Sequence, residues 1–124
     1  VCSSDLQLYK KTHVNHPSAV WTRASWANYD YVYSLFVACN YEYYTRYNKW
    51  HATYVKLGKL LENKPDRIHI SYDLTPPPQC MPDEYKSDAT FDGTIAAYRN
   101  YYRGEKRDFA KWKYTKEPYW WNES

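Results

Sequence analysis

Basic and aromatic side chains are interleaved in the last quarter of the chain. Between Arg99 and Lys116 seven basic residues stand against two acidic ones, so the local charge is +5 (7 − 2). Basic residues at helical spacing can follow a phosphate backbone, and the Tyr and Trp rings among them can stack on unpaired or flipped bases. The alternative is a solvated basic face whose rings belong to the core. The predicted nucleic-acid-binding residues are Arg99, Arg103, Lys106, Arg107, Lys111 and Trp112.

Two residues are candidates for catalysis, Glu42 and His16. Glu42 stands in an aromatic stretch four residues before Arg46, so an i,i+4 ion pair on a helix surface is the favoured interpretation. The alternative is a carboxylate in an apolar wall that acts as a general base, with a second acid such as Glu84 to complement it.

A zinc site can be imagined around the His-x-x-His pattern of His13 and His16, completed by His51 or Cys39. The two histidines precede a helix instead of lying on one, and no second paired motif follows. We therefore expect capping and surface hydrogen bonds here, with no metal and no cofactor. The three cysteines include no close pair, and the three glycines form no phosphate-binding loop.

The composition predicts one globular domain. A chain of 124 residues is the size of a single domain, and 44% hydrophobic with 25% charged residues is too apolar for disorder and too interrupted by charge for a membrane span. Tyrosine is in excess, with 16 Tyr and 6 Trp against 3 Phe. Most aromatic rings can therefore pack and hydrogen-bond at once. The net charge of +3 permits an anionic partner without requiring one.

The first half of the chain has helical periodicity. A helix should begin at about Pro17, because proline suits the first turn. Ser25 can cap a long helix over 26–47, in which aromatic residues recur three or four apart, and Asn48 can stop or kink it. A further helix is predicted over 49–62. We expect Trp21 and Tyr29 in the core.

The second half begins with prolines and becomes helical again. Residues 63–82 hold five prolines and predict an extended connection, with a short strand over 67–72. A turn over 83–86 precedes a helix that Thr90 or Asp92 caps and Gly104 ends. Residues 105–113 should add one or two amphipathic turns. The expected fold is all-α, a single compact domain of about four or five helices.

We interpret the first six residues as foreign to the natural protein. Val1-Cys2-Ser3-Ser4-Asp5-Leu6 can be read as the in-frame translation of a common sequencing adapter. We therefore expect the helical domain over 7–124, and a natural N-terminal part upstream of Gln7.

A series of short motifs resembles a family of small proteins from tailed phages and large DNA viruses. The motifs run from 11–17 through Trp21, 28–29, 42–43, 46–49, His51, 81–85 and 97–102 to 118–121. Their order is more distantly similar to phage pyrimidine-dimer DNA glycosylases, small all-α enzymes that flip a base and cut with an N-terminal amine and a glutamate. Members of the viral family usually carry an upstream helix, which this sequence does not include, and a glycine where Asn48 stands.

The resemblance implies a viral DNA-handling protein for repair or base modification, in the cytoplasm of an infected host cell, that binds nucleic acid through the basic aromatic C-terminal region. It transfers no catalytic residue to this chain, and whether the chain is an enzyme stays open. The alternative is a non-catalytic protein encoded by the virus that sequesters a nucleotide or a host protein. A purely structural domain is the third possibility.

Overall fold

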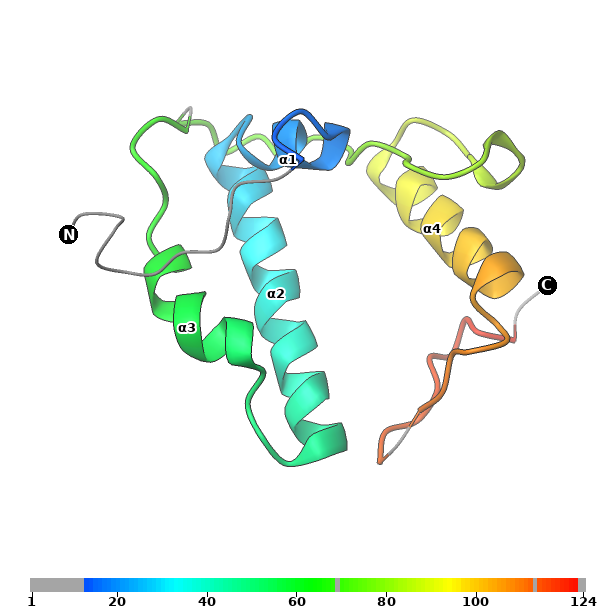
Figure 1. The fold of residues 1–124 in the computed structure, drawn as a ribbon. Coiled ribbons are helices and arrows are strands. Elements are labelled where there is room, and N and C mark those ends of the chain that lie inside the picture. Colours follow the sequence, from blue (N-terminus) through cyan, green and yellow to red (C-terminus); the bar gives the residue numbers. More distant parts are fainter. Residues whose placement is uncertain (1–12, 69, 113, 123–124) are drawn as a thin grey trace.

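The longest predicted helix is present with the bounds expected. In the computed structural model, which describes residues 13–68, 70–112 and 114–122, α2 spans Trp26–Tyr47 (Figure 1). The Ser25 side chain caps it by accepting a hydrogen bond from the N–H of Asn28 at 3.1 Å. Asn48 ends it in the left-handed conformation at φ 54°, which asparagine tolerates better than most residues. The predictions for residues 1–6 lie outside the described residues.

Two shorter helices, α1 (Pro17–Thr22) and α3 (Ala52–Leu61), begin with a histidine cap. In each, the Nδ1 atom of the capping residue, His16 or His51, accepts a hydrogen bond of 3.1 Å from the backbone N–H two residues later. Helix α3 begins three residues later than predicted, because residues 48–51 turn the chain back along α2 before the cap.

The C-terminal helix is α4 (Phe91–Glu105), preceded by a short 3-10 helix, η2 (Asp83–Tyr85). Thr90, one of the two predicted caps, accepts a hydrogen bond from the N–H of Gly93 at 2.9 Å. Gly104 does not end α4 as predicted. A Cβ atom there would lie 2.5 Å from the Tyr85 hydroxyl oxygen, so glycine serves close packing of η2 on the helix.

Of two weaker predictions, the strand over 67–72 is wrong, whereas the one or two turns predicted over 105–113 are present as one turn in the described residues. The strand over 67–72 is absent from the described residues, since the carbonyl of Ser71 accepts its hydrogen bond from the N–H of Ala27 at the start of α2 and not from a neighbouring strand. Residues 105–112 form one turn, closed from the N–H of Ala110 to the carbonyl of Lys106 at 3.0 Å, and no further helix. The fold class is confirmed, because the described residues form four α-helices and no strand.

The proline-rich connection passes from α3 along the ends of α1 and α2 to α4 (Figure 1). Asn28 is fully buried and holds it. Its Nδ2 donates to the Trp21 carbonyl at 2.9 Å and to the Thr75 hydroxyl at 3.1 Å, and its Oδ1 accepts from the Thr75 N–H at 3.2 Å. Ser25 adds a bond from its hydroxyl to the Asp73 carbonyl at 3.2 Å. Side chains therefore supply the anchoring that a sheet would supply through its backbone.

The interior is small and contains polar side chains. Trp21 and Tyr29, expected in the core, are only half-buried, because the Trp21 indole N–H bonds to Thr75 and the Tyr29 hydroxyl to the Leu61 carbonyl near the surface. Among the described residues the buried apolar side chains are Ile68, Ala97 and Trp121, and the buried polar ones are Ser25, Asn28, Asn40 and Thr94.

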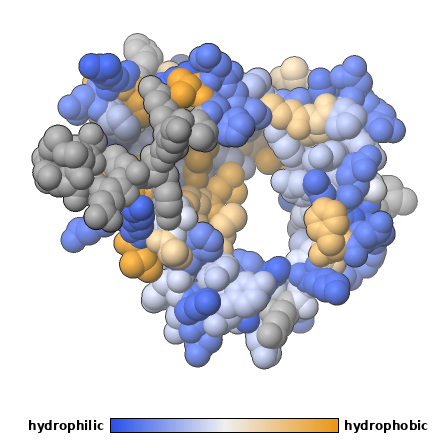
Figure 2. All heavy atoms as spheres, in the orientation of Figure 1, coloured by the Kyte–Doolittle hydropathy of each residue, from blue (hydrophilic) through white to orange (hydrophobic). Residues whose placement is uncertain are grey.

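The α2 and α4 sides of the molecule face each other across an opening. Figure 2 shows this opening, with hydrophobic side chains gathered on the α2 side of it. The two sides meet through the rings of Tyr31 and Phe91, whose centroids are 5.2 Å apart in an edge-to-face arrangement. Within the described part of the chain, no helix has the length and apolar character needed to cross a membrane.

We expect Asn28→Ala to lower the free energy of unfolding by about 2 to 3 kcal/mol. Each buried polar group left without a partner costs roughly 1 to 3 kcal/mol, and the substitution strips partners from Thr75 and from the Trp21 carbonyl. Chemical denaturation followed by circular dichroism measures the change. Asn63→Ala, at an exposed asparagine just beyond α3, is the control and should change little. Equal stability of both variants would contradict the anchoring role.

The contact of η2 with α4 predicts a pH dependence. The Tyr85 hydroxyl donates to the Glu105 carboxylate at 2.8 Å, and this bond, followed by desolvation, raises the pKa of Tyr85 from 10.0 to about 12. The contact stabilises the fold below pH 10, and the contribution is lost between about pH 10 and 12. Carbon NMR of the tyrosine Cζ atoms should show the pKa of Tyr85 falling in Glu105→Gln and not in Asp108→Asn.

Candidate functional site

The predicted cations Arg99 and Arg103 lie in the last turns of α4, Lys106 is its C-cap, and all three are half-buried. The guanidinium of Arg99 lies over the ring of Tyr119 at 5.5 Å and over that of Trp120 at 5.3 Å. Such cation–π contacts are electrostatic and leave the positive charge in place. The structure thus joins this part of the helix to the aromatic end of the chain.

Two arginines hold the C-terminal segment 114–122 against α4. Arg103 Nη1 donates to the carbonyl of Trp120 at 2.7 Å, and Arg107 Nη2 donates to the carbonyl of Trp121 at 2.9 Å. The Arg107 guanidinium also lies 4.9 Å from the centre of the Trp121 ring, which is the one buried aromatic ring among the described residues. Both arginines therefore have structural contacts in addition to any with a ligand, which the sequence pattern did not reveal.

The remaining predicted residues lie beside this cluster. Lys106 is placed over the rings of Tyr101 at 5.3 Å and Phe109 at 5.5 Å. Trp112 is half-buried and packs edge-to-face on Trp121, at 4.8 Å between ring centroids, so part of its ring area is already used in packing. Lys111 is exposed. Contacts with the segment 119–121 join four of the six predicted residues in one aromatic-cationic surface, namely Arg99, Arg107 and Trp112 through rings and Arg103 through the Trp120 carbonyl. Lys106 lies next to this surface, and no ring contact of Lys111 is found within the described residues.

A groove of about 360 Å³ runs beside this surface on α4. Its lining combines positive charge from Arg99 and Arg103 with the carboxylate of Asp92 and the amide of Asn100. Arg103 Nη2 also donates to the side-chain oxygen Oδ1 of Asn100. The groove can therefore accept an anionic group near the arginines, while Asp92 limits how far along α4 the positive region extends.

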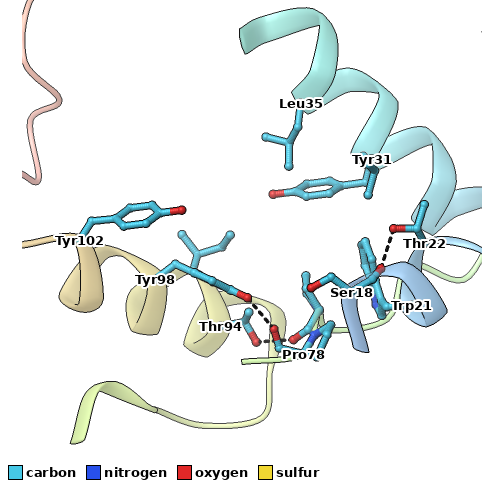
Figure 3. A pocket seen from close by; sticks show the side chains of 12 residues that line it. Ser18, Trp21, Thr22, Tyr31, Leu35, Pro78, Thr94, Tyr98 and Tyr102 are labelled. Atoms are coloured by element: carbon cyan, nitrogen blue, oxygen red, sulfur yellow. Dashed lines mark hydrogen bonds between the residues drawn. The ribbon is translucent and has the colours of Figure 1, made fainter. Parts of the chain in front are cut away.

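An apolar cleft of about 400 Å³ lies between α1, α2 and α4 and was not found from the sequence (Figure 3). Its residues on α4 are far in sequence from those on α1 and α2, so no local motif marks it. The only sequence signal was the spacing of Ile95, Tyr98 and Tyr102 along one face of the last long helix. The cleft is lined by Ser18, Trp21, Thr22, Tyr31, Val32, Leu35, Pro77, Pro78, Thr94, Ile95, Tyr98 and Tyr102.

The hydroxyl groups in the cleft fall into two classes. Tyr98 donates to the Pro78 carbonyl at 2.9 Å and accepts from the Cys80 N–H at 3.3 Å, so it fixes the wall, and burial raises the pKa of this tyrosine. The hydroxyls of Tyr31 and Tyr102 point toward each other from opposite walls in Figure 3, and neither bonds within the described residues. They are available to orient a ligand.

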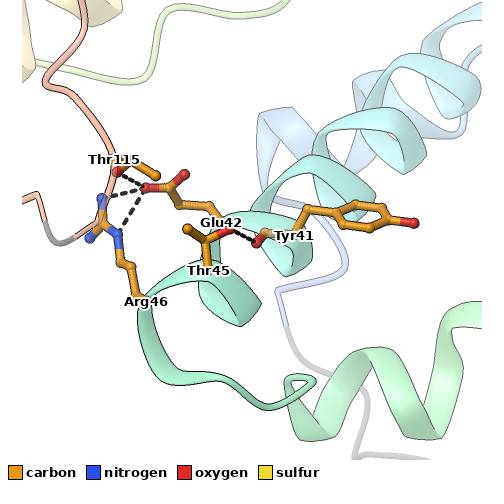
Figure 4. A network of polar contacts seen from close by, with 5 residues as sticks. All are labelled: Tyr41, Glu42, Thr45, Arg46 and Thr115. Carbon is orange, nitrogen blue, oxygen red and sulfur yellow. Dashed lines mark hydrogen bonds and ion pairs between the residues drawn. The ribbon is translucent and has the colours of Figure 1, made fainter.

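Glu42 closes the other end of the opening (Figure 4). Its Oε1 accepts bonds from Arg46 Nε at 2.9 Å and from the Thr115 hydroxyl at 2.8 Å, and it forms an ion pair with Arg46 Nη2 at 2.8 Å. The i,i+4 ion pair favoured from the sequence is present. No contact joins Glu42 to Glu84, which lies in η2, so the described contacts do not assemble a catalytic pair.

His16 and His51 serve as helix caps, and the backbone carbonyl of His13 accepts a bond from the His16 N–H at 3.1 Å. Nδ1 of His16 accepts the capping bond from the Ser18 N–H, so this nitrogen is already used and is not free to ligate a metal ion. His51 caps α3 in the same way, and Cys39 and Cys80 are exposed free thiols. Within the described residues, no group of three or more His, Cys, Asp or Glu side chains is arranged to hold a metal ion.

Comparison of the chain with models of known protein families, with curated proteins and with solved structures finds no match in any of the three. Functional inference therefore depends on the geometry and charge of the surfaces described above.

Proposed function

We propose that this is a viral DNA-handling protein that binds nucleic acid through α4 and the C-terminal segment 114–122. The observation that carries the proposal is the alignment of the α4 cations with aromatic rings, above all Arg99 over Tyr119 and Trp120. Tyr119 is largely exposed, and so is Phe109 beside Lys106. Exposed rings next to fixed cations suit a polymer of bases and phosphates.

The contacts of the arginines leave donors for a phosphate. Arg99 has five N–H donors and uses one of them, on the Tyr119 hydroxyl at 3.3 Å. Its partners are rings and neutral oxygens, which do not cancel its charge. The groove beside Arg99 and Arg103 offers space in which a phosphate could approach both. Repair or base modification is the proposed context, in keeping with the resemblance of the sequence to viral proteins.

Charge reversal at Lys106 and Lys111 tests the proposal. We expect Lys106→Glu with Lys111→Glu to weaken binding to duplex DNA of any sequence, and to reduce the slope of log affinity against log salt by about 1 for each phosphate that these lysines no longer bind. Fluorescence anisotropy at two salt concentrations measures both. These lysines are preferred to Arg103 and Arg107, which also hold the C-terminal segment.

The matched control changes the same charge elsewhere. Arg23→Glu with Lys86→Glu alters two exposed cations outside α4 and the C-terminal segment, and should affect DNA affinity far less. If both double variants weaken binding equally, the effect comes from net charge alone and the proposed surface is wrong.

A second candidate function is sequestration of a nucleotide in the apolar cleft. Its volume of about 400 Å³ lies within the range of small-molecule sites. The hydroxyls of Tyr31 and Tyr102 could bond the edge of a base. Ile95 lines both the cleft and the groove that contains Arg99, so a phosphate on the same ligand would have a cation beside it.

Filling the cleft tests this second function. Leu35 lines the cleft yet is 49% exposed, so Leu35→Trp should block the space without a large loss of stability. Calorimetric titration with nucleosides and nucleoside monophosphates should show binding to the original chain and at least tenfold weaker binding to this variant. Leu60→Trp, at a leucine on α3 that is 45% exposed, is the control. Equal binding by both variants would exclude the cleft as the nucleotide site.

A further inference from the structure

A second group of aromatic rings, three exposed and one half-buried, lies at the corner where α2 turns into α3. We call Tyr41, Tyr44, Trp50 and Tyr54 the corner platform. Trp50 is stacked on Tyr44 with ring centroids 4.4 Å apart and an interplanar angle of 30°, and it is near parallel to Tyr54 at 6.0 Å. Tyr41 meets Trp50 edge-to-face at 5.6 Å. Four rings therefore share one surface, with Trp50 in contact with all the others.

The platform is exposed although its loop is fixed. Trp50 keeps 44% and Tyr41 56% of its surface accessible, which is unusual for large rings in mutual contact. Asn48 turns the loop in the left-handed conformation, and the buried Asn40 accepts a hydrogen bond from the His51 N–H at 3.2 Å through its Oδ1. Because the loop is bonded on both sides of Trp50, the ring is presented in a defined position.

Basic residues outnumber acidic ones around the platform, where Glu42 is paired with Arg46 and Glu62 lies near Lys59. The sequence between Glu42 and Glu62 contains no acidic residue and four basic ones. A groove of about 360 Å³ adjoins Trp50 between α2 and α3, and Lys59 lines it together with Glu62 at its margin. The four basic residues are Arg46, Lys49, Lys56 and Lys59.

The platform lies on the opposite side of α2 from the contact with the C-terminal segment. In Figure 4 the ring of Tyr41 points away from Glu42, Arg46 and Thr115. Thr115 belongs to the segment that α4 holds, and its bond to Glu42 brings that segment to the last turns of α2. The corner platform and the first surface are therefore separate, and the end of one helix lies between them.

We propose that the corner platform is a second binding site, which takes single-stranded nucleic acid by stacking bases on Trp50 and Tyr41 while Lys49 and Lys59 contact phosphates. The inference rests on the proposed function, since it assigns a further contact to the same polymer. Stacking is the interaction that accepts any base, because every base has a π-face. The excess of basic over acidic residues favours a polyanion over an uncharged or a basic partner.

Trp50→Ala in the full chain tests the inference, with oligo-dT and a duplex of equal length as the two probes. Loss of one stacked base should weaken oligo-dT binding about 5- to 140-fold, which corresponds to 1–3 kcal/mol at 1.4 kcal/mol per tenfold, and leave duplex binding within about twofold. Tyr72→Ala removes an exposed ring that packs on Trp26 at the other end of α2, and should change neither affinity.

Two further variants keep the test valid if Trp50→Ala disturbs the fold, because Trp50 also packs on its neighbours. Tyr41→Ala removes the more exposed ring, and Lys59→Gln should lower the salt slope for oligo-dT by about 1. Circular dichroism must show unchanged helicity in each. If the folded variants bind oligo-dT as the original chain does, the platform is not a nucleic-acid site.

The two proposals fail in different ways. If Lys106→Glu with Lys111→Glu weakens DNA binding and the platform variants do not, the proposed function stands and the further inference is wrong. If the platform variants lose oligo-dT while the C-terminal charge reversal changes nothing, the platform is the binding site and the proposed α4 surface is wrong. If the original chain binds neither probe, both are overturned.

Discussion

The position of α4 relative to α2 depends on a buried amide. The connection between α3 and α4 carries five prolines and no ladder of backbone hydrogen bonds in its described residues, so side chains must fix its course. The Asn28 amide does this by bonding to Thr75 from inside the fold while it also holds the Trp21 carbonyl at the end of α1. A buried amide without hydrogen-bond partners would raise the free energy of the folded state. The Asn28 amide is satisfied when the connection lies beside it, so this bond fixes the course of the connection.

This mode of assembly explains why the molecule contains a cleft. The connection fixes α2 and α4 at one end, and the bond of Thr115 to Glu42 joins the end of α2 to the C-terminal segment that Arg103 of α4 holds. Between these points the rings of Tyr31 and Phe91 link the two helices directly. Helices that are held at their ends need not pack along their length, so the apolar faces between them remain open and offer space for a ligand (Figure 3).

The sequence predicts those features that depend on neighbouring residues. The bounds of α2 followed from Ser25, the aromatic period and Asn48, because caps and stops act within a turn. The role of Gly104 at the end of α4 could not be predicted in this way. It is set by the ring of Tyr85, which is distant in sequence. The basic aromatic surface was predicted from composition, whereas the cleft required three segments that only the folded chain brings together.

Arginine and lysine have different roles in the proposed binding surface, because the arginines make structural contacts and lysines such as Lys111 stay exposed. Arginine can bond a carbonyl through its planar fork and lie over a ring at the same time, as Arg107 does with Trp121. Neither partner carries a negative charge, and the bonds of Arg99 and Arg103 are likewise to rings and neutral oxygens. The positive charges of the arginines that stabilise the C-terminal segment are therefore not neutralised by these contacts. Exposed lysines such as Lys111 add further positive charge to this surface. In the proposed binding, the arginines hold the C-terminal segment in place, and the arginines and lysines together attract the polyanion.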